Sequence, residues 1–183
     1  MIMNATQSQL VLIDFQPRLM AAIDEGEFVL KNAQRLAQAA KILQVPAWGT
    51  EQNPSKLGPL DSVLSSLAGE TFGKMEFGSG DTSLFERLGP PGAAGSAVAN
   101  TIVVAGCEAH ICLLQTALKL KASGFEVVAV SDACGSRTPR NHGAAMDRLT
   151  SAGCHVVTTE MVLFEWLGSA AHDRFKEVQA LIK

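Results

Sequence analysis

Short continuous runs of apolar residues alternate along the chain with stretches in which apolar residues recur at helical spacing. Residues 9–15 are mostly apolar and include Asp14 near their end, as expected of a strand that is covered on both faces. Between Val29 and Leu43 the apolar positions recur mostly three or four residues apart, as in an amphipathic helix, and Pro46 follows. These two segments predict a strand followed by a helix.

The same alternation continues through the rest of the chain. Further extended segments are predicted at residues 46–51, 71–77, 101–106, 126–131 and 155–159. Further helices are predicted near residues 61–67, 82–88, 110–123, 139–152, 162–167 and 173–182. Thr138 and Pro139 are residue types favoured where a helix begins, and the Gly- and Pro-bearing segments 52–58 and 89–92 predict loops.

Strands that alternate with helices predict a Rossmann-like, three-layer α/β/α sandwich around a mainly parallel sheet with right-handed crossovers. Such sheets bind ligands at the carboxyl ends of their strands. Polar residues at those ends are therefore site candidates, namely Asp14, Glu51, Cys107, Glu108 and Asp132.

The composition fits one domain that spans residues 1–183. Hydrophobic residues make up 47% of the chain, which is enough for a sizeable core, and no apolar run is long enough to cross a membrane. Residues 1–7 lack the charged and apolar regions of a signal peptide, so we expect a cytoplasmic protein whose four cysteines are free.

The charge pattern indicates the class of partner. The formal net charge is −3, and lysines and arginines are spread along the chain without a basic block. Nucleic acids and anionic membranes are therefore not expected as partners, and a small-molecule substrate is.

Cys112 lies in the first turn of the predicted helix 110–123, where unpaired amides and the helix dipole favour a thiolate. Asp14, at the end of another strand, is suitably placed to act as its base, and Lys74 can supply a compensating cation. Each residue also has an ordinary interpretation. Free cysteines often pack as small hydrophobes, strand-end aspartates bind backbone amides, and single lysines are usually solvated.

Other candidate chemistry is weaker. His110 is two residues before Cys112, and residues two apart on a helix do not face each other. We therefore expect His110 to support other residues of the site, to face the substrate, or to be a solvated capping residue. Cys107, His110 and Cys112 match no common zinc spacing, so we expect neither a metal nor a cofactor. Segments 78–81 and 89–95 lack the Gly-Lys-Ser/Thr of a phosphate-binding loop.

Three segments taken together resemble the three ordered motifs of the isochorismatase-like cysteine hydrolases: VLIDFQ (11–16), KMEF (74–77) and AGCEAHIC (105–112). The resemblance covers nearly the whole chain and is nearest to the isochorismatase domain-containing proteins, through residues 50–58, 108–112 and 132–137. It implies a six-stranded sheet and a triad of Asp14 as general base, Lys74 as electrostatic partner and Cys112 as nucleophile.

The resemblance also implies a cis peptide bond between Cys107 and Glu108, with the backbone amides of Glu108 and Cys112 forming an oxyanion hole. The Glu108 side chain then either lines the pocket or caps a neighbouring loop. Further candidate pocket residues are Phe15, Gln16, Glu51, Gln52, Phe77 and His110.

Two departures from family patterns narrow the function. The nicotinamidases of this superfamily carry an Asp-x-His-x-x-His metal site, and the corresponding segment 51–54 reads EQNP, so no metal is implied and nicotinamide is disfavoured as substrate. True isochorismatases have glycine where this chain has Cys112, so their vinyl-ether chemistry is not implied either.

On the basis of this resemblance we expect the protein to be a hydrolase that cleaves an amide-type C–N bond of a small molecule through a thioester intermediate. The alternative is a catalytically idle member of the family that acts as a thiol redox sensor or a protein-interaction scaffold. Many relatives form dimers or larger assemblies, so a homo-oligomer is expected, with the apolar segment 161–167 as a candidate contact.

Overall fold

The computed structural model describes residues 1–79, 83–92 and 100–183. Residue 82 of one predicted helix and residues 93–95 of the glycine-bearing segment lie outside the described residues. All six strands are parallel and form one sheet in the order β3-β2-β1-β4-β5-β6. Their bounds are β1 Ser8–Ile13, β2 Ala47–Gln52, β3 Glu70–Lys74, β4 Thr101–Cys107, β5 Glu126–Gly135 and β6 His155–Val157.

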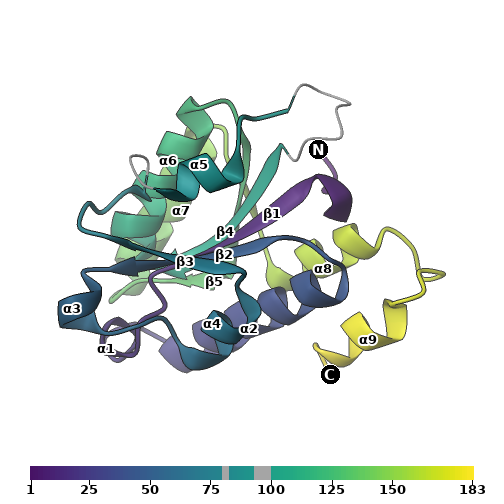
Figure 1. Cartoon of the computed structure of the whole chain (residues 1–183), viewed down its shortest axis with the longest axis horizontal. Helices are drawn as coiled ribbons and strands as arrows, with labels where there is room; N and C mark the ends of the chain where they lie inside the picture. The colour runs from purple at the N-terminus through teal and green to yellow at the C-terminus, as the bar shows by residue number, and fades with distance from the viewer. Residues whose placement is uncertain (80–82, 93–99) are drawn as a thin grey trace.

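Helices cover both faces of the sheet, which confirms the predicted three-layer α/β/α sandwich (Figure 1). One layer contains α2 Gly26–Ile42, α4 Ser62–Leu67, α8 Thr159–Leu167 and α9 Phe175–Ala180. The other contains α5 Ser83–Leu88, α6 Leu114–Ala122 and α7 Pro139–Ser151. Short helices lie in the connections: η1 Ala5–Gln7, α1 Pro17–Met20, α3 Pro54–Leu57 and the π-helix Ala109–Leu113.

The strands read as continuous apolar runs because each packs against both helical layers. Successive side chains of a strand point to opposite faces. Leu10 and Leu12 pack in the core on the α2 side, whereas Val11 and Ile13 pack in the core on the α6 side. All six residues of β1 are buried, so a polar residue just beyond its end is likewise surrounded by protein.

The order of the strands defines where the chain changes direction across the sheet. From β1 the chain moves to β2 and β3 at one edge, and then returns to β4 on the other side of β1. The carboxyl ends of β1 and β4 therefore meet at the topological switch point, where sheets of this kind bind ligands. Asp14 follows β1 and Cys107 ends β4 at this point.

Several elements differ from the predicted ones. Two short helices, α1 and α3, occupy segments for which no helix was predicted, and both begin at a proline. The strand predicted at 71–77 ends at Lys74, and β5 continues to Gly135, beyond its predicted end at 131. The pairing of β4 with β5 shifts register between Val104 and Gly106, and this irregularity accompanies the extra length of β5.

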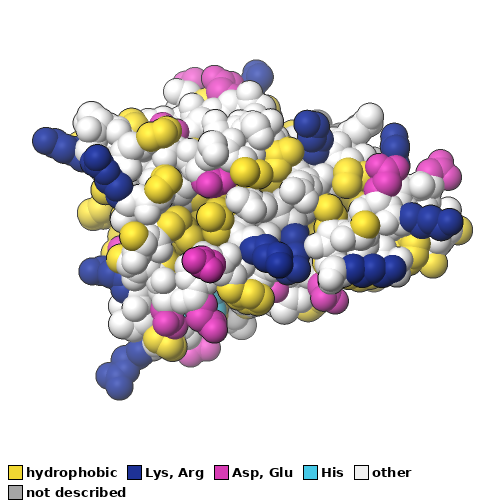
Figure 2. All heavy atoms as spheres, turned by 90° about the horizontal axis from the view of Figure 1, so that it is seen from below, with side chains coloured by type: hydrophobic (Ala, Val, Ile, Leu, Met, Phe, Trp, Pro, Cys, Tyr) yellow, Lys and Arg dark blue, Asp and Glu magenta, His cyan; other side chains and the backbone are white. Residues whose placement is uncertain are grey.

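The outer face of the layer that contains α2 is neither uniformly acidic nor uniformly basic (Figure 2). Figure 2 shows basic and acidic side chains distributed over it, with hydrophobic groups between them. Among the described residues, no helix is long and apolar enough to cross a membrane.

Candidate active site

Asp14 is held in place by Thr50 of the neighbouring strand β2. It adopts a left-handed backbone conformation, with φ 56°, which is uncommon for a residue other than glycine. Its backbone N–H donates to the carbonyl of Thr50 (3.1 Å), and the Thr50 hydroxyl donates to Asp14 Oδ1 (2.7 Å). The residue is fully buried, so its carboxylate is oriented before any ligand binds.

Lys74 forms a buried ion pair with this carboxylate. The distance from Lys74 Nζ to Asp14 Oδ2 is 2.7 Å, and both side chains are 0% exposed. The ammonium also donates to Gln52 Oε1 (2.8 Å) and to the carbonyl of Phe77 (3.1 Å). A buried charge is costly unless it is paired and hydrogen-bonded, and Lys74 satisfies both conditions.

Cys112 lies in the π-helix between β4 and α6, with its thiol against Asp14. Leu113 N–H donates to the carbonyl of Glu108 (3.2 Å), which is the wider turn of a π-helix. The Asp14 carboxylate and the backbone N–H of Glu108 both lie close enough to the Cys112 sulfur to shift the pKa of the thiol, the carboxylate raising it and the N–H lowering it. Carboxylate, ammonium and thiol therefore converge from three separate parts of the chain.

The Cys112 thiol is protonated at neutral pH. Burial raises the pKa of Cys112 to about 12, and the negative charge of Asp14 adds to this, whereas the Lys74 ammonium lowers it. The prediction of a thiolate stabilised at the helix entrance is therefore wrong for the unliganded protein. The side chain is nearly enclosed, and desolvation outweighs the favourable partial charges of the helix.

The two glutamines proposed as pocket residues are structural partners of the triad. Gln52 Oε1 accepts from Lys74, and its Nε2 donates to the carbonyl of Met75 (2.7 Å). Gln16 Oε1 accepts from Gln52 N–H (2.8 Å), and its Nε2 donates to the carbonyls of Gln52 (3.0 Å) and Gly58 (2.6 Å). Both amides are occupied by protein groups, so their place in a substrate pocket stays a prediction, and the contacts seen are structural.

Phe15 and Glu51 also lie away from the site. Phe15 is fully buried in the core on the α2 side. Glu51 lies between Thr50 and Gln52 on β2, and its side chain points to the other face, where Oε1 accepts from Leu60 N–H (2.8 Å). The contacts of these two side chains therefore lie in the core and at Leu60, and their place in a substrate pocket stays a prediction.

Glu108 and His110 tie the site to the loop before α7. The peptide bond between Cys107 and Glu108 is cis, and the Glu108 carboxylate accepts from Arg137 Nε (2.7 Å). His110 Nδ1 is 3.0 Å from the Ser136 hydroxyl. Two roles were left open for the Glu108 side chain, lining the pocket or capping a neighbouring loop. Its contact with Arg137 favours the second role.

The remaining predicted pocket residue, Phe77, is 55% exposed beside the triad, and its carbonyl accepts from Lys74. Thr50 is a site residue that no motif marks, although its position two residues before Gln52 puts both on the same face of β2. Ser136 and Arg137 were not assigned either, because their contacts depend on how the β5–α7 loop folds back on Glu108.

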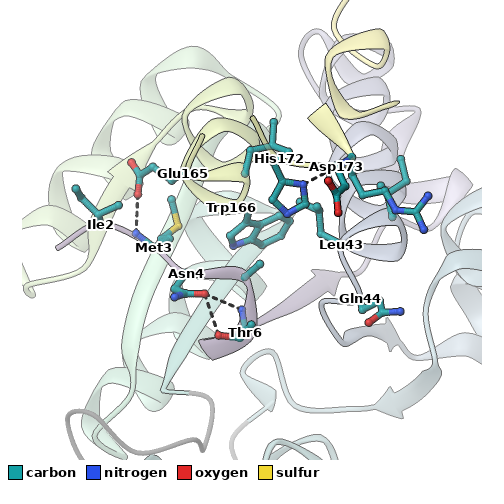
Figure 3. A pocket seen from close by; sticks show the side chains of 15 residues that line it. Ile2, Met3, Asn4, Thr6, Leu43, Gln44, Glu165, Trp166, His172 and Asp173 are labelled. Atoms are coloured by element: carbon teal, nitrogen blue, oxygen red, sulfur yellow. Dashed lines mark hydrogen bonds between the residues drawn. The ribbon is translucent and has the colours of Figure 1, made fainter. Parts of the chain in front are cut away.

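Several cavities in the described part of the chain lie outside the triad, two of them at opposite edges of the sheet. One of about 710 Å³ is at the amino-terminal edge of the sheet, where Asn4, Leu43, Trp166 and His172 face it (Figure 3). The other, about 360 Å³, lies at the carboxyl edge between the beginnings of α2 and α7 and includes Ser136. Within residues 1–79, 83–92 and 100–183, no group of three or more His, Cys, Asp or Glu is arranged to hold a metal ion.

A doubly wound parallel sheet with a buried carboxylate, ammonium and thiol at its switch point defines the class as the isochorismatase-like α/β/α proteins. The chain belongs to the isochorismatase family, since the Isochorismatase domain model matches residues 8–161.

Relatives support this assignment over nearly the full chain. Isochorismatase domain-containing protein 2 of Xenopus laevis is 34% identical over 175 residues, which cover 96% of this chain and 83% of the relative. A Caenorhabditis elegans structure, described as the MAR1 ribonuclease, is 30% identical with a TM-score of 0.90, and covers 98% of this chain and 91% of its own. The Escherichia coli YcaC gene product, described as an octameric hydrolase of unknown specificity, is 22% identical with a TM-score of 0.86, covering 98% and 88%.

Proposed function

We propose that this protein is a hydrolase that cleaves an amide-type C–N bond of a small molecule through a thioester on Cys112. The observation that carries the proposal is the position of the Asp14 carboxylate, which contacts both the Lys74 ammonium and the Cys112 thiol. A base in contact with a nucleophile, and itself oriented by a third group, is the arrangement of nucleophilic catalysis.

In the first half of the proposed reaction the Cys112 sulfur attacks the substrate carbonyl carbon while the thiol proton passes to Asp14. Because the pKa of Cys112 is about 12, this proton transfer accompanies attack rather than preceding substrate binding. The backbone amides of Glu108 and Cys112 donate to the developing oxyanion. Asp14 then gives the proton to the departing nitrogen, the C–N bond breaks, and a thioester remains.

In the second half a water molecule takes the place of the amine. Asp14 removes a proton from the water as its oxygen attacks the thioester carbon, and the oxyanion occupies the same donors. The C–S bond breaks, and Asp14 returns the proton to the Cys112 sulfur. Lys74 stays an ammonium throughout and stabilises the negative charge shared by Asp14 and the sulfur.

The Glu108 amide is suitably located for this role. Its N–H is near the Cys112 sulfur, where it lowers the otherwise raised pKa of the thiol. When the sulfur bonds to carbon, the same N–H is close to the carbonyl oxygen. Loss of one such donor typically costs about 3–4 kcal/mol of transition-state stabilisation.

Amine release from a panel of small primary and secondary amides tests the proposal. We expect turnover by the wild-type protein, and a fall of at least about 10³-fold in Cys112→Ala, since the nucleophile is removed. Cys154→Ala is the matched control, because Cys154 is also a free cysteine but packs in the core on the α6 side. Turnover that survives in Cys112→Ala would refute the thioester route.

RNA should be tested as a second substrate class in the same experiment, because the C. elegans relative is described as a ribonuclease. Acyl transfer through a thioester requires a carbonyl carbon, which a phosphodiester lacks. We expect no Cys112-dependent cleavage of RNA. Cleavage that is lost in Cys112→Ala would contradict the proposed substrate class.

The same geometry counts against the redox-sensor alternative. Redox-sensor thiols are exposed and have a low pKa. Cys112 is 5% exposed, and its pKa is raised.

We further propose that residues 1–183 act as one domain and that copies of the chain associate. Self-association is supported by the octameric state described for the E. coli relative. It is also supported by exposed apolar side chains on α8, where Met161 is 46% and Phe164 is 41% exposed.

A further inference from the structure

Every hydrogen of the Lys74 ammonium has an acceptor within the protein. A lysine ammonium donates three hydrogen bonds. Asp14 Oδ2, Gln52 Oε1 and the Phe77 carbonyl lie 2.7, 2.8 and 3.1 Å from Nζ, and the Glu76 carbonyl lies at 3.4 Å. No donor of Lys74 is left over for a substrate.

Among these acceptors, only Gln52 and Asp14 are side chains. Gln52 and Lys74 are paired residues in the register of β2 and β3, so their side chains leave the sheet side by side. The Gln52 amide is oriented by its second bond, in which Nε2 donates to the Met75 carbonyl (2.7 Å). With Nε2 fixed there, Oε1 is directed at the ammonium.

The backbone of Gln52 is fixed as well. Gln16 accepts from Gln52 N–H (2.8 Å) and donates to the Gln52 carbonyl (3.0 Å), and Gln16 is itself fully buried. Gln16 follows Asp14 by two residues. The segment that carries the proposed base, Asp14, therefore also fixes the position of Gln52, which in turn contacts Lys74. The chain of contacts runs from Gln16 to Gln52, Lys74, Asp14 and Cys112.

We propose that Gln52 is a positioning residue, which holds the Lys74 ammonium against Asp14 as a fixed charge that does not bind substrate. This proposal rests on the proposed function for its catalytic consequence, since the ammonium then stabilises the charge that Asp14 and the Cys112 sulfur exchange. Substrate recognition must therefore come from residues other than Lys74.

A purely structural role for Gln52 is the competing explanation, because a buried glutamine with two side-chain bonds also holds β2 to β3. Gln9 provides a matched control. It is 6% exposed, its Nε2 donates to the Leu88 carbonyl (3.0 Å), and its Oε1 accepts from Trp48 Nε1 (2.8 Å). Gln9 lies on β1 and makes no contact with the triad.

The first test measures the Lys74 ammonium directly, by solvent exchange of its hydrogens in ¹⁵N-lysine spectra of the whole protein at low temperature. We expect exchange at least tenfold faster in Gln52→Met, which keeps the chain length and loses the acceptor. Gln52→Glu keeps an acceptor oxygen and is expected to retain protection, and Gln9→Met is expected to behave as wild type. Equal protection in Gln52→Met and wild type overturns the proposal.

The second test measures catalysis with the amide that the panel identifies. We expect Gln52→Met to lower kcat at least tenfold with KM changed less than twofold, and Gln9→Met to leave both within twofold. A rise in KM alone would return Gln52 to the substrate pocket and overturn the positioning role. If no amide is turned over by the wild type, the proposed function fails, whereas the exchange measurement still decides whether Gln52 positions Lys74.

Discussion

Asp14 is the central residue of the site because it contacts the other two members of the triad. Its Oδ2 is 2.7 Å from the Lys74 ammonium, and its carboxylate contacts the Cys112 thiol. Thr50 donates to the remaining oxygen (2.7 Å), so the carboxylate cannot turn away from its partners. The chemistry at the residue scale therefore depends on one buried charge that is hydrogen-bonded at both of its oxygens.

The buried ion pair predicts a large stability effect of a single substitution. Lys74→Met leaves the Asp14 carboxylate buried without its counter-charge, and we expect the free energy of unfolding to fall by about 3–5 kcal/mol. Urea denaturation measures it. In the control Lys121→Met, the partner Glu126 is 38% exposed, and we expect a loss below about 1 kcal/mol. Equal losses in the two variants would contradict the account of the pair.

The raised pKa of Cys112 predicts the pH dependence of its alkylation. Because burial raises this pKa to about 12, the thiolate fraction of the folded protein keeps rising above pH 9, where an ordinary thiol levels off. We expect the rate of Cys112 carbamidomethylation, read by peptide mass spectrometry, to rise about tenfold per pH unit from pH 7 to 10. A plateau below pH 9 would show a stabilised thiolate instead.

The sequence alone indicated which three residues lie together in the proposed triad, and not how they are held. Asp14, Lys74 and Cys112 follow from motif order and strand ends, both of which a sequence displays. The roles of Gln16 and Gln52 depend on contacts across 36 residues of sequence, and no local pattern reports such a contact. The protonation state of Cys112 was also mispredicted, because the helix position was visible and the extent of burial was not.

At the scale of elements, the junction of β1 and β4 sets the geometry of the site. Gly106 lies one residue before the end of β4 and pairs with Ile13, the last residue of β1. A Cβ atom at position 106 would lie 2.3 Å from the Ile13 carbonyl oxygen. The two strands that carry Asp14 and Cys107 approach closely only because this residue is glycine.

This close approach predicts opposite effects of two glycine substitutions. We expect Gly106→Ala to lower the free energy of unfolding by about 1–3 kcal/mol or more, as overpacking does. A Cβ at Gly143, within α7, meets nothing within 4 Å, so Gly143→Ala is expected to raise stability by about 0.5–1 kcal/mol. Denaturation midpoints of the two variants decide the matter, and a neutral Gly106→Ala would contradict the described packing.

The regular elements were the most predictable and the irregular ones the least. Strands β1 and β4 are apolar on both faces, so their runs are visible in the sequence. The π-helix that carries Cys112 was predicted as the start of an ordinary helix, because its wider turn leaves the spacing of apolar residues almost unchanged. Strand β3 ends at Lys74, where its pairing with β2 also ends, although the extended pattern continues to residue 77.

At the scale of the whole molecule, the sheet separates the triad from the cavity in Figure 3. The triad lies at the carboxyl ends of the strands, and that cavity lies at their amino-terminal edge. The α/β/α architecture could be predicted because strands and helices alternate along the chain. The continuous apolar runs of the strands and the three- or four-residue apolar spacing of the helices are both visible in the sequence. The arrangement of the loops at the site does not follow in this way.

Self-association is the prediction that belongs to this scale. Phe164 on α8 is 41% exposed and lies 6.4 Å, between ring centroids, from Phe175 of α9. We expect light scattering to give a mass at least twice the 19.3 kDa of one chain, and Phe164→Lys to reduce it. Phe28→Lys, at a 51% exposed phenylalanine of α2, is the control and is expected to leave the mass unchanged. A wild-type protein that is monomeric at micromolar concentration would contradict the prediction.

The covalent intermediate gives the most direct test of the account. The enzyme is mixed with an amide that it turns over, quenched with acid during the steady state, and weighed intact before peptide mapping. We predict a mass increase equal to the acyl group, located on Cys112, present in Cys154→Ala and missing in Cys112→Ala. Turnover without any acyl adduct on Cys112, in a quench fast enough to sample the steady state, would contradict the thioester mechanism.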